Sequence, residues 1–150
     1  MKICLACSAG GHLSQMQELT DAIAGKTYFW VTYQSEASKD LENAYFINYR
    51  VGYIKERITW LKTVFIAFKI LLKEKPDVII SIGGGEIAVP FCYAGKLMGA
   101  RIIFIESLAR ITTASAAGKL IYPVANLFLV QWKPLLKQYG NRAQYWGSVI

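Results

Sequence analysis

Residues 77–86 read Asp77-Val78-Ile79-Ile80-Ser81-Ile82-Gly83-Gly84-Gly85-Glu86, and this run indicates the class of fold. Its first part is almost continuously apolar, which is typical of a parallel strand that is buried on both faces. Glycines follow the strand directly, and an apolar helical pattern begins after them at Ile87. A strand that passes through a glycine-rich turn into a helix is one half of a β–α–β unit. The run therefore predicts an α/β protein.

The same alternation of strand-like and helix-like segments extends from this run toward both ends of the chain. Apolar or β-branched runs predict strands at Lys2–Cys7, Tyr28–Tyr33, Ala44–Asn48, Asp77–Ile82, Arg101–Ile105, Leu127–Val130 and Gln144–Trp146. Helical patterns lie near Leu13–Ala24, Tyr53–Lys75, Ile87–Met98, Ser115–Val124 and Pro134–Tyr139. Strands that alternate with helices through short loops form right-handed crossovers. We therefore predict one Rossmann-like domain over residues 1–150, an open and mostly parallel sheet with helices on both faces.

The composition sets further limits. The chain has 150 residues, of which 54% are hydrophobic, so it is long enough for one domain and too apolar to be disordered. It contains no uncharged apolar run of about 18 residues, the length that a membrane-spanning helix needs. Its start at Met1-Lys2 does not resemble a signal peptide. The 17 Lys and Arg residues outnumber the 10 Asp and Glu residues, for a net charge of +7, and we expect a basic cytoplasmic domain.

The chain contains three cysteines and one histidine. Cys4 and Cys7 have the spacing of a metal-binding or redox pair, but side chains three apart on a strand point to opposite faces. No second cysteine pair accompanies them, and Cys92 and His12 do not complete a four-ligand zinc site. We therefore expect reduced, buried thiols, with no metal ion and no cofactor.

Open α/β sheets bind ligands outside the carboxyl ends of their strands, and the first strand ends in a glycine turn. This turn reads Ser8-Ala9-Gly10-Gly11-His12. Glycine lets the backbone approach a ligand closely, and a helix N-terminus favours an anion. The dinucleotide pattern G-x-G-x-x-G is absent, and the second strand closes on Tyr33-Gln34 rather than on an acid. His12 is either a packing or capping residue or, with a usual pKa near 6.5, a general base or phosphate ligand.

Two further strand ends carry unusual residues. Gly83, Gly84 and Gly85 form either a second anion-binding turn or a mobile loop that needs positive φ angles. Two such turns at one sheet edge would suit a ligand with two phosphates. The fifth strand ends in Glu106-Ser107, and a carboxylate at the end of an apolar strand needs a partner, a helix to cap or a catalytic task. We expect the segment from Ser115 to Gly118 to open a helix toward the same crevice.

Segment 50–75 is both basic and apolar, with seven Lys or Arg residues against two Glu, or +5 of the net +7. Helical periodicity gives it two apolar stripes, Ile54, Ile58, Leu61, Phe65, Phe68 and Leu72, and Trp60, Val64, Ala67 and Leu71. We expect the first stripe to pack on the sheet and the second to meet a membrane, through Trp60, Lys62, Val64, Lys69 and Leu71. A partner subunit on this surface, or an ordinary core helix with solvated lysines, are the alternatives. Nucleic acid is disfavoured, because no recognised binding motif accompanies the lysines.

Several motifs, taken in order, resemble those of one known family. They are Ser8-Ala9-Gly10-Gly11-His12, Gly83–Gly85, Phe104-Ile105-Glu106-Ser107, Ser115, Gly118-Lys119-Leu120, Tyr122-Pro123 and Val130-Gln131-Trp132. The sequence resembles the oligosaccharide-biosynthesis subunit that recruits the eukaryotic dolichol-pathway N-acetylglucosaminyltransferase to its membrane. It resembles more closely the bacterial counterpart of that subunit in capsule and exopolysaccharide synthesis. It is also similar to the acceptor half of the peptidoglycan N-acetylglucosaminyltransferase, a GT-B enzyme.

The resemblance implies the N-terminal, acceptor-binding half of a split GT-B glycosyltransferase. A catalytic partner subunit would hold a UDP-sugar, and the complex would transfer the sugar, with inversion, to a polyprenyl-diphosphate-linked saccharide. His12 or Glu106 would be the general base, and the usual pKa of histidine favours His12. The residues expected to bind the acceptor diphosphate are Gly10, Gly11, Gly83, Gly84, Gly85, Ser107, Ser115 and Gly118.

The location of the complex also follows from the resemblance. The eukaryotic members carry an N-terminal membrane helix that this sequence does not show, and segment 54–72 is the expected replacement, peripheral on the inner face of the cell membrane. Two other functions stay open at this point. The chain could be a non-catalytic scaffold for a separately competent transferase, or a nucleotide-binding oxidoreductase, which the missing dinucleotide pattern disfavours.

Overall fold

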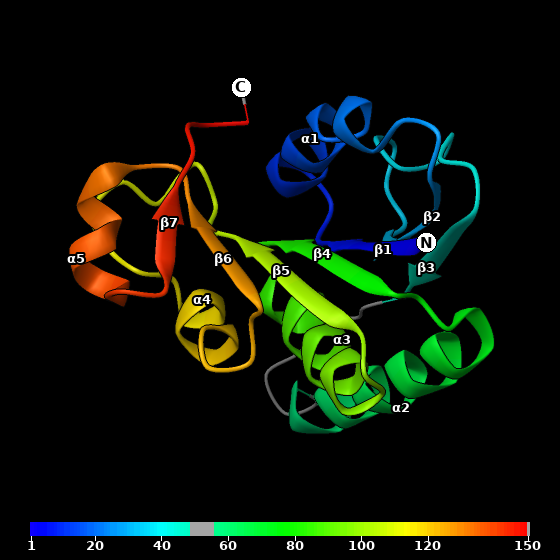
Figure 1. The fold of residues 1–150 in the computed structure, drawn as a ribbon. Coiled ribbons are helices and arrows are strands. Elements are labelled where there is room, and N and C mark those ends of the chain that lie inside the picture. The colour runs from blue at the N-terminus through cyan, green and yellow to red at the C-terminus, as the bar shows by residue number, and fades with distance from the viewer. Residues whose placement is uncertain (49–55, 150) are drawn as a thin grey trace.

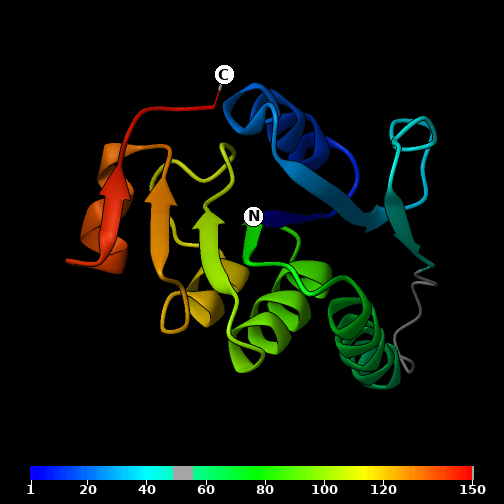
Figure 2. The same ribbon diagram turned by 45° about the vertical axis from the view of Figure 1, so that its right-hand side comes forward.

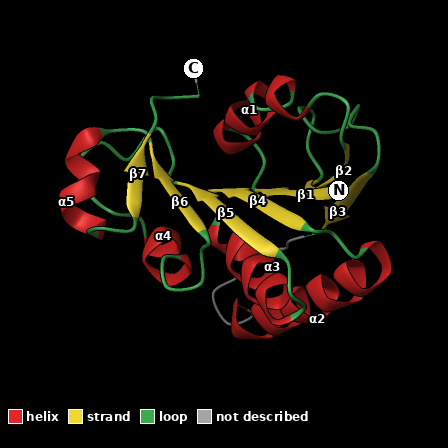
Figure 3. Ribbon diagram, in the orientation of Figure 1, coloured by secondary structure: helices red, strands yellow, loops and turns green. Residues whose placement is uncertain are grey.

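The fold is a seven-stranded, fully parallel sheet with helices on both faces. The computed structural model describes residues 1–48 and 56–149 of the chain, with the strand order β3-β2-β1-β4-β5-β6-β7 (Figures 1 and 3). The strands are β1 Lys2–Cys7, β2 Thr27–Tyr33, β3 Ala44–Ile47, β4 Val78–Ile82, β5 Arg101–Ile105, β6 Leu127–Val130 and β7 Ala143–Tyr145. Every predicted strand is present, and the Rossmann-like fold class is confirmed.

The helices also follow the predicted order. They are α1 Gly11–Glu18, α2 Glu56–Glu74, α3 Gly85–Leu97, α4 Ala116–Ile121 and α5 Leu136–Tyr139, with short 3-10 turns at Asp21–Ile23 and Lys133–Leu135. The predicted first helix is in fact two pieces, because α1 ends before the 3-10 turn. The predicted start of the second helix, residues 53–55, lies outside the described residues.

The sheet separates two apolar cores. Leu13 and Met16 of α1 pack with Ile3, Leu5 and Trp30 on one face. On the other face, α2, α3 and α4 lie side by side beneath the sheet (Figure 2), and their buried side chains join the larger core. Strands buried on both faces need apolar residues at every position, which explains the continuous apolar runs in β4 and β5.

The central pair of strands fixes where the loops meet. β1 and β4 pair in parallel with Cys7 opposite Ile82, so the residues that follow these two strands lie next to each other. Ser81 is fully buried, and its hydroxyl donates a hydrogen bond of 2.6 Å to the carbonyl oxygen of Ala6. This pairing places the Ser8–His12 turn beside the Gly83–Gly85 turn.

The cysteines are free and buried. Cys4 faces the larger core and Cys7 the smaller one, as expected for side chains three apart on a strand. Burial raises the pKa of Cys7 and of Cys92 to about 12, because a thiolate is poorly solvated there. Both thiols are therefore protonated and unreactive near neutral pH.

The structure corrects the two faces predicted for α2. Leu71 is fully buried in the larger core, and Val64 is partly buried, so Leu71 cannot contact a membrane. Leu61, Phe65 and Leu72, predicted to pack on the sheet, are instead 64%, 73% and 60% exposed. From residue 60 onward, the buried side of α2 consists of Thr63, Ala67, Ile70 and Leu71.

Size explains this choice of face. The small side chains of Thr63 and Ala67 let the helix backbone come close to its neighbours, which bulky phenylalanines would prevent. Trp60, Lys62 and Lys69 of the predicted membrane-binding set remain exposed. No helix in the described part of the chain has both the length and the apolar character needed to cross a bilayer.

Two adjacent leucines test the corrected face. Leu71→Ala removes fully buried methyl groups and should lower the free energy of unfolding by about 2–5 kcal/mol. Leu72→Ala, at the neighbouring exposed position, should change it by less than about 0.5 kcal/mol. Urea unfolding followed by circular dichroism measures both. Equal losses, or a larger loss for Leu72, would contradict the assignment of the faces.

Candidate functional site

The candidate site lies where β1 and β4 end. Ser8 follows β1, and its Oγ lies 2.7 Å from Nδ1 of His12, in the first turn of α1. No group in the described part of the chain hydrogen-bonds to the other ring nitrogen, Nε2. His12 is half-buried and lies at the carboxyl edge of the sheet, where open α/β sheets bind their ligands.

The Gly83–Gly84 turn is shaped around this pair. Gly83 and Gly84 have φ angles of 49° and 58°, which disfavour any residue with a Cβ. A Cβ on Gly84 would lie 2.7 Å from Cβ and Oγ of Ser8, and one on Gly83 would collide with the His12 ring. The two glycines therefore admit the Ser8 and His12 side chains, a requirement independent of any ligand.

Burial sets the charge state of His12. Desolvation lowers the pKa of its imidazole below the usual 6.5, whereas the carboxylates of Glu106 and Glu86 act in the opposite direction and are weaker. His12 is therefore neutral at pH 7, the state in which an imidazole accepts a proton.

The N-termini of α1 and α3 both open at this site. α1 begins after Gly10 and α3 after Gly84, and neither helix has a side-chain cap. In contrast, Ser115 caps α4 by accepting a hydrogen bond of 2.8 Å from the amide of Gly118. Uncapped first-turn amides and the helix dipole attract an anion. The structure thus brings together Gly10, Gly11, Gly83, Gly84 and Gly85, five of the residues predicted to bind diphosphate.

Glu106 has a different environment from His12. Its carboxylate is fully buried and accepts hydrogen bonds from the amide of Ser107, from the amide and hydroxyl of Ser115, and from the hydroxyl of Tyr139. Burial and the Glu106 carboxylate raise the pKa of Tyr139, so its hydroxyl keeps the proton that it donates. A buried carboxylate is tolerated when its oxygens are hydrogen-bonded in this way. Glu106 joins the end of β5 to α4 and α5.

This network uses hydrogen-bond donors of three residues that were predicted to bind diphosphate. Ser107, Ser115 and Gly118 are buried, and their amides or hydroxyls are engaged with Glu106 or with each other. The amide of Gly118 in particular already donates to Ser115. The donors of Ser115, the amide of Gly118 and the amide of Ser107 are therefore engaged inside the protein, whereas the hydroxyl of Ser107 accepts from the amide of Ala109.

Two glutamines, to which the sequence alone assigned no role, also lie at this edge of the sheet. Gln15 Oε1 accepts from the amide of Leu108 at 2.9 Å and from Nε2 of Gln131 at 2.8 Å. Gln131 also donates to the carbonyl of Glu106 and accepts from the amide of Val149 in the C-terminal segment. Both side chains are buried, which fixes α1 against the ends of β5 and β6. Gln15 lies between the core residues Leu13 and Met16 in the sequence. A polar residue at that position was the sequence signal that could have indicated a buried hydrogen bond.

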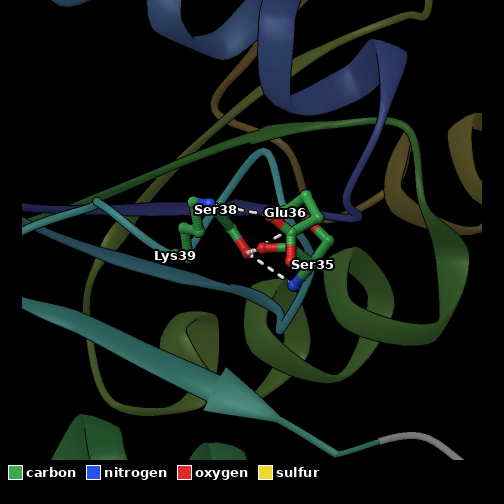
Figure 4. Close-up of polar contacts among 4 residues, drawn as sticks. All are labelled: Ser35, Glu36, Ser38 and Lys39. Carbon is green, nitrogen blue, oxygen red and sulfur yellow. Dashed lines mark hydrogen bonds and ion pairs between the residues drawn. The ribbon is translucent and has the colours of Figure 1, made fainter.

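The loop after β2 forms another part of this edge (Figure 4). The buried hydroxyl of Ser38 accepts from the amide of Ser35 and donates to the carbonyl of Tyr33 at 2.7 Å. Glu36 and Lys39 pair at 2.7 Å on the exposed side, where an ion pair contributes little to stability. No group of three or more His, Cys, Asp or Glu side chains in the described ranges could hold a metal ion.

Comparison with known proteins decides the family. Residues 47–149 match the family described as "Oligosaccharide biosynthesis protein Alg14 like". This chain belongs to the Alg14 family. Over 169 residues it is 31% identical to the UDP-N-acetylglucosamine transferase subunit alg14 of Schizosaccharomyces pombe, covering 94% of this chain and 80% of that one. It is 25% identical to the subunit ALG14 of Mus musculus, covering 100% and 83%.

Solved structures show the same fold with little sequence similarity. MurG from Acinetobacter baumannii matches this Alg14-family chain with a TM-score of 0.78 at 16% identity. A UDP-GlcNAc 2-epimerase from Methanocaldococcus jannaschii, in complex with UDP-GlcNAc and UDP, matches with a TM-score of 0.78 at 15% identity. The matches cover 98% and 99% of this chain but only 45% and 47% of those proteins. The fold is therefore that of one half of a GT-B glycosyltransferase or epimerase.

Two Tyr→Phe variants test the network behind the crevice. Tyr139→Phe removes the hydroxyl that donates to the buried Glu106 and should lower the free energy of unfolding by about 1–3 kcal/mol. Tyr93→Phe removes an exposed hydroxyl that donates to the carbonyl of Leu120, and should cost less than about 0.5 kcal/mol. Thermal and urea unfolding measure both. No difference between the two variants would show that Tyr139 does not support the carboxylate.

Proposed function

We propose that this chain is the acceptor-binding subunit of a UDP-sugar-dependent glycosyltransferase. The partner subunit supplies the half that holds the UDP-sugar, and the acceptor is a polyprenyl-diphosphate-linked saccharide of capsule or exopolysaccharide synthesis. The names of the relatives, UDP-N-acetylglucosamine transferase subunits, support transfer of N-acetylglucosamine. The relatives are named as subunits of a transferase, which supports a second chain that supplies the other half.

One observation carries the proposal. A neutral histidine, with no hydrogen bond to Nε2 from the described residues, lies in the first turn of α1 beside the turn that opens α3, and neither helix has a side-chain cap. The first-turn amides of α1 and α3 would hold the diphosphate of the acceptor, because they offer uncapped donors to an anion. The same arrangement would place the acceptor hydroxyl near His12.

The proposed reaction moves one proton to His12 and replaces one bond at the anomeric carbon of the sugar. Nε2 of His12 accepts the proton of the acceptor hydroxyl while its oxygen forms a bond to the anomeric carbon of the sugar. The bond from that carbon to the UDP oxygen breaks, and UDP leaves with the electron pair. Attack from the face opposite UDP inverts the anomeric configuration. Glu106 is not our choice of base, since its oxygens are already hydrogen-bonded.

A scaffold function would not require the residues of this site for the rate of the reaction. A protein that only recruits a competent transferase needs no free histidine between uncapped helices, and its His12 could be replaced without loss of rate. An oxidoreductase is disfavoured because β2 closes on Tyr33 and Gln34, without the acid that binds a dinucleotide ribose.

The His12→Ala variant tests the catalytic role. In the complex with the partner subunit, turnover should fall at least 100-fold, as expected for loss of a general base. Association of the subunits, measured by size-exclusion chromatography, should not change, and Ser14→Ala on the exposed side of α1 is the matched control. Near-normal turnover in His12→Ala would favour the scaffold.

The pH dependence gives an independent check. Because burial lowers the pKa of His12, the base stays unprotonated until the pH falls below the usual 6.5 of histidine. The kcat/KM of the complex should therefore be constant above pH 7 and decline on the acid side with a midpoint below 6.5. A decline centred above pH 7 would contradict a buried, neutral base.

We also propose that α2 meets the membrane through the corrected face. Leu61, Phe65 and Leu72 form an exposed apolar stripe, and Lys62 and Lys69 lie beside it. Apolar groups next to lysines suit an anionic bilayer surface, where the apolar stripe enters the headgroup layer. Trp60, 45% exposed, lies on the same helix.

Charge neutralisation tests this contact. Each basic residue near an anionic surface contributes about 1 kcal/mol, so Lys62→Gln with Lys69→Gln should weaken binding to anionic liposomes about 30-fold. Lys26→Gln with Lys137→Gln, exposed lysines outside α2, should leave binding nearly unchanged. Liposome sedimentation at constant ionic strength measures both. Equal losses in the two double variants would indicate attraction by net charge alone.

A further inference from the structure

We propose that Ser8 is a positioning residue that holds the His12 ring in the form protonated on Nδ1, with the lone pair on Nε2 directed into the crevice. The inference rests on the proposed role of His12 as the base and adds the group that prepares it. Ser8 itself does not contact the reacting atoms in this account.

The contact between the two side chains carries the inference. Ser8 Oγ and His12 Nδ1 lie 2.7 Å apart, a short hydrogen-bond distance, and the two residues belong to one tight turn between β1 and α1. A serine hydroxyl rotates and can accept a proton from Nδ1. This hydrogen bond fixes the position of the ring. It also determines that Nδ1 is the nitrogen that faces away from the crevice.

The placement of Gly83 keeps the second nitrogen accessible. A Cβ built on Gly83 would lie 2.5 Å from Cδ2 and 2.6 Å from Cε1 of His12, and closer still to Nε2. These nearly equal distances put Gly83 over the face of the ring rather than in line with the Nε2 lone pair. The ring is therefore packed between Ser8 and Gly83, and Gly83 does not block the in-plane direction from Nε2.

The hydrogen bond between Ser8 and His12 is compatible with the tautomer that we propose. With the proton on Nδ1, the N–H has Ser8 as its acceptor, and Nε2 presents only a lone pair. With the proton on Nε2, a half-buried N–H would have no acceptor among the described residues. The same tautomer is the one that a general base at Nε2 requires.

The single histidine of this chain makes the test direct. In the full chain labelled with ¹⁵N-histidine, every imidazole signal belongs to His12. At pH 7.5 the wild-type spectrum should show a protonated Nδ1 and an unprotonated Nε2. Ser8→Ala should shift the population toward the Nε2-protonated form, whereas Ser14→Ala should keep the wild-type spectrum. A wild-type ring protonated on Nε2, or an unchanged spectrum in Ser8→Ala, overturns the proposal.

Kinetics of the complex provide the second measurement. Ser8→Ala should lower kcat about 10-fold while the KM for the acceptor changes less than about threefold, since orientation of the base is lost rather than substrate binding. Ser8→Thr keeps a hydroxyl and should recover most of the rate. A wild-type kcat in Ser8→Ala overturns the positioning role. Failure of the proposed function would give a different pair of results. His12→Ala would then show normal turnover, while the NMR spectra would still show that the tautomer depends on Ser8.

Discussion

The parallel pairing of β1 with β4 is the contact on which the site depends. With Cys7 opposite Ile82, the turn that carries Ser8 and the turn that carries Gly83 leave the sheet side by side. The buried bond from Ser81 to the carbonyl of Ala6 reinforces this register. A shift of one residue would move the turns apart and reverse the buried side chains of both strands. The position of His12 is thus a consequence of how the sheet is assembled.

Two kinds of polar group lie at the carboxyl edge of this sheet. Glu106, with Ser115, Tyr139 and the glutamine pair, is fully hydrogen-bonded and buried, and it joins β5, α4, α5 and α1. His12 has one nitrogen hydrogen-bonded to Ser8, and no residue in the described part of the chain hydrogen-bonds to the other. Several hydrogen bonds tie the first kind into the fold, and in the proposed mechanism this network supports His12 from behind.

The sequence allowed a good prediction of the fold and a partial prediction of the site. Apolar runs such as Val78–Ile82 locate parallel strands because burial on both faces permits no polar alternation. The α2 faces could not be assigned, because Leu61 and Leu71 belong to two stripes that are both apolar, and close packing of Thr63 and Ala67 decided between them. The partner of Glu106, Tyr139, lies 33 residues away, so local patterns give no sign of that bond. Gly118 looked like a ligand-binding glycine, yet its amide is engaged inside the protein.

The most direct test is a transferase assay with separated subunits. The purified chain, the protein encoded by the neighbouring reading frame, and their mixture are each incubated with a polyprenyl-diphosphate-linked disaccharide and UDP-N-acetylglucosamine, followed by other UDP-sugars. An acceptor-binding half without a nucleotide-sugar half should be inactive alone, so product should form only in the mixture. If the partner alone reaches the rate of the mixture, this chain is not the acceptor half of the enzyme.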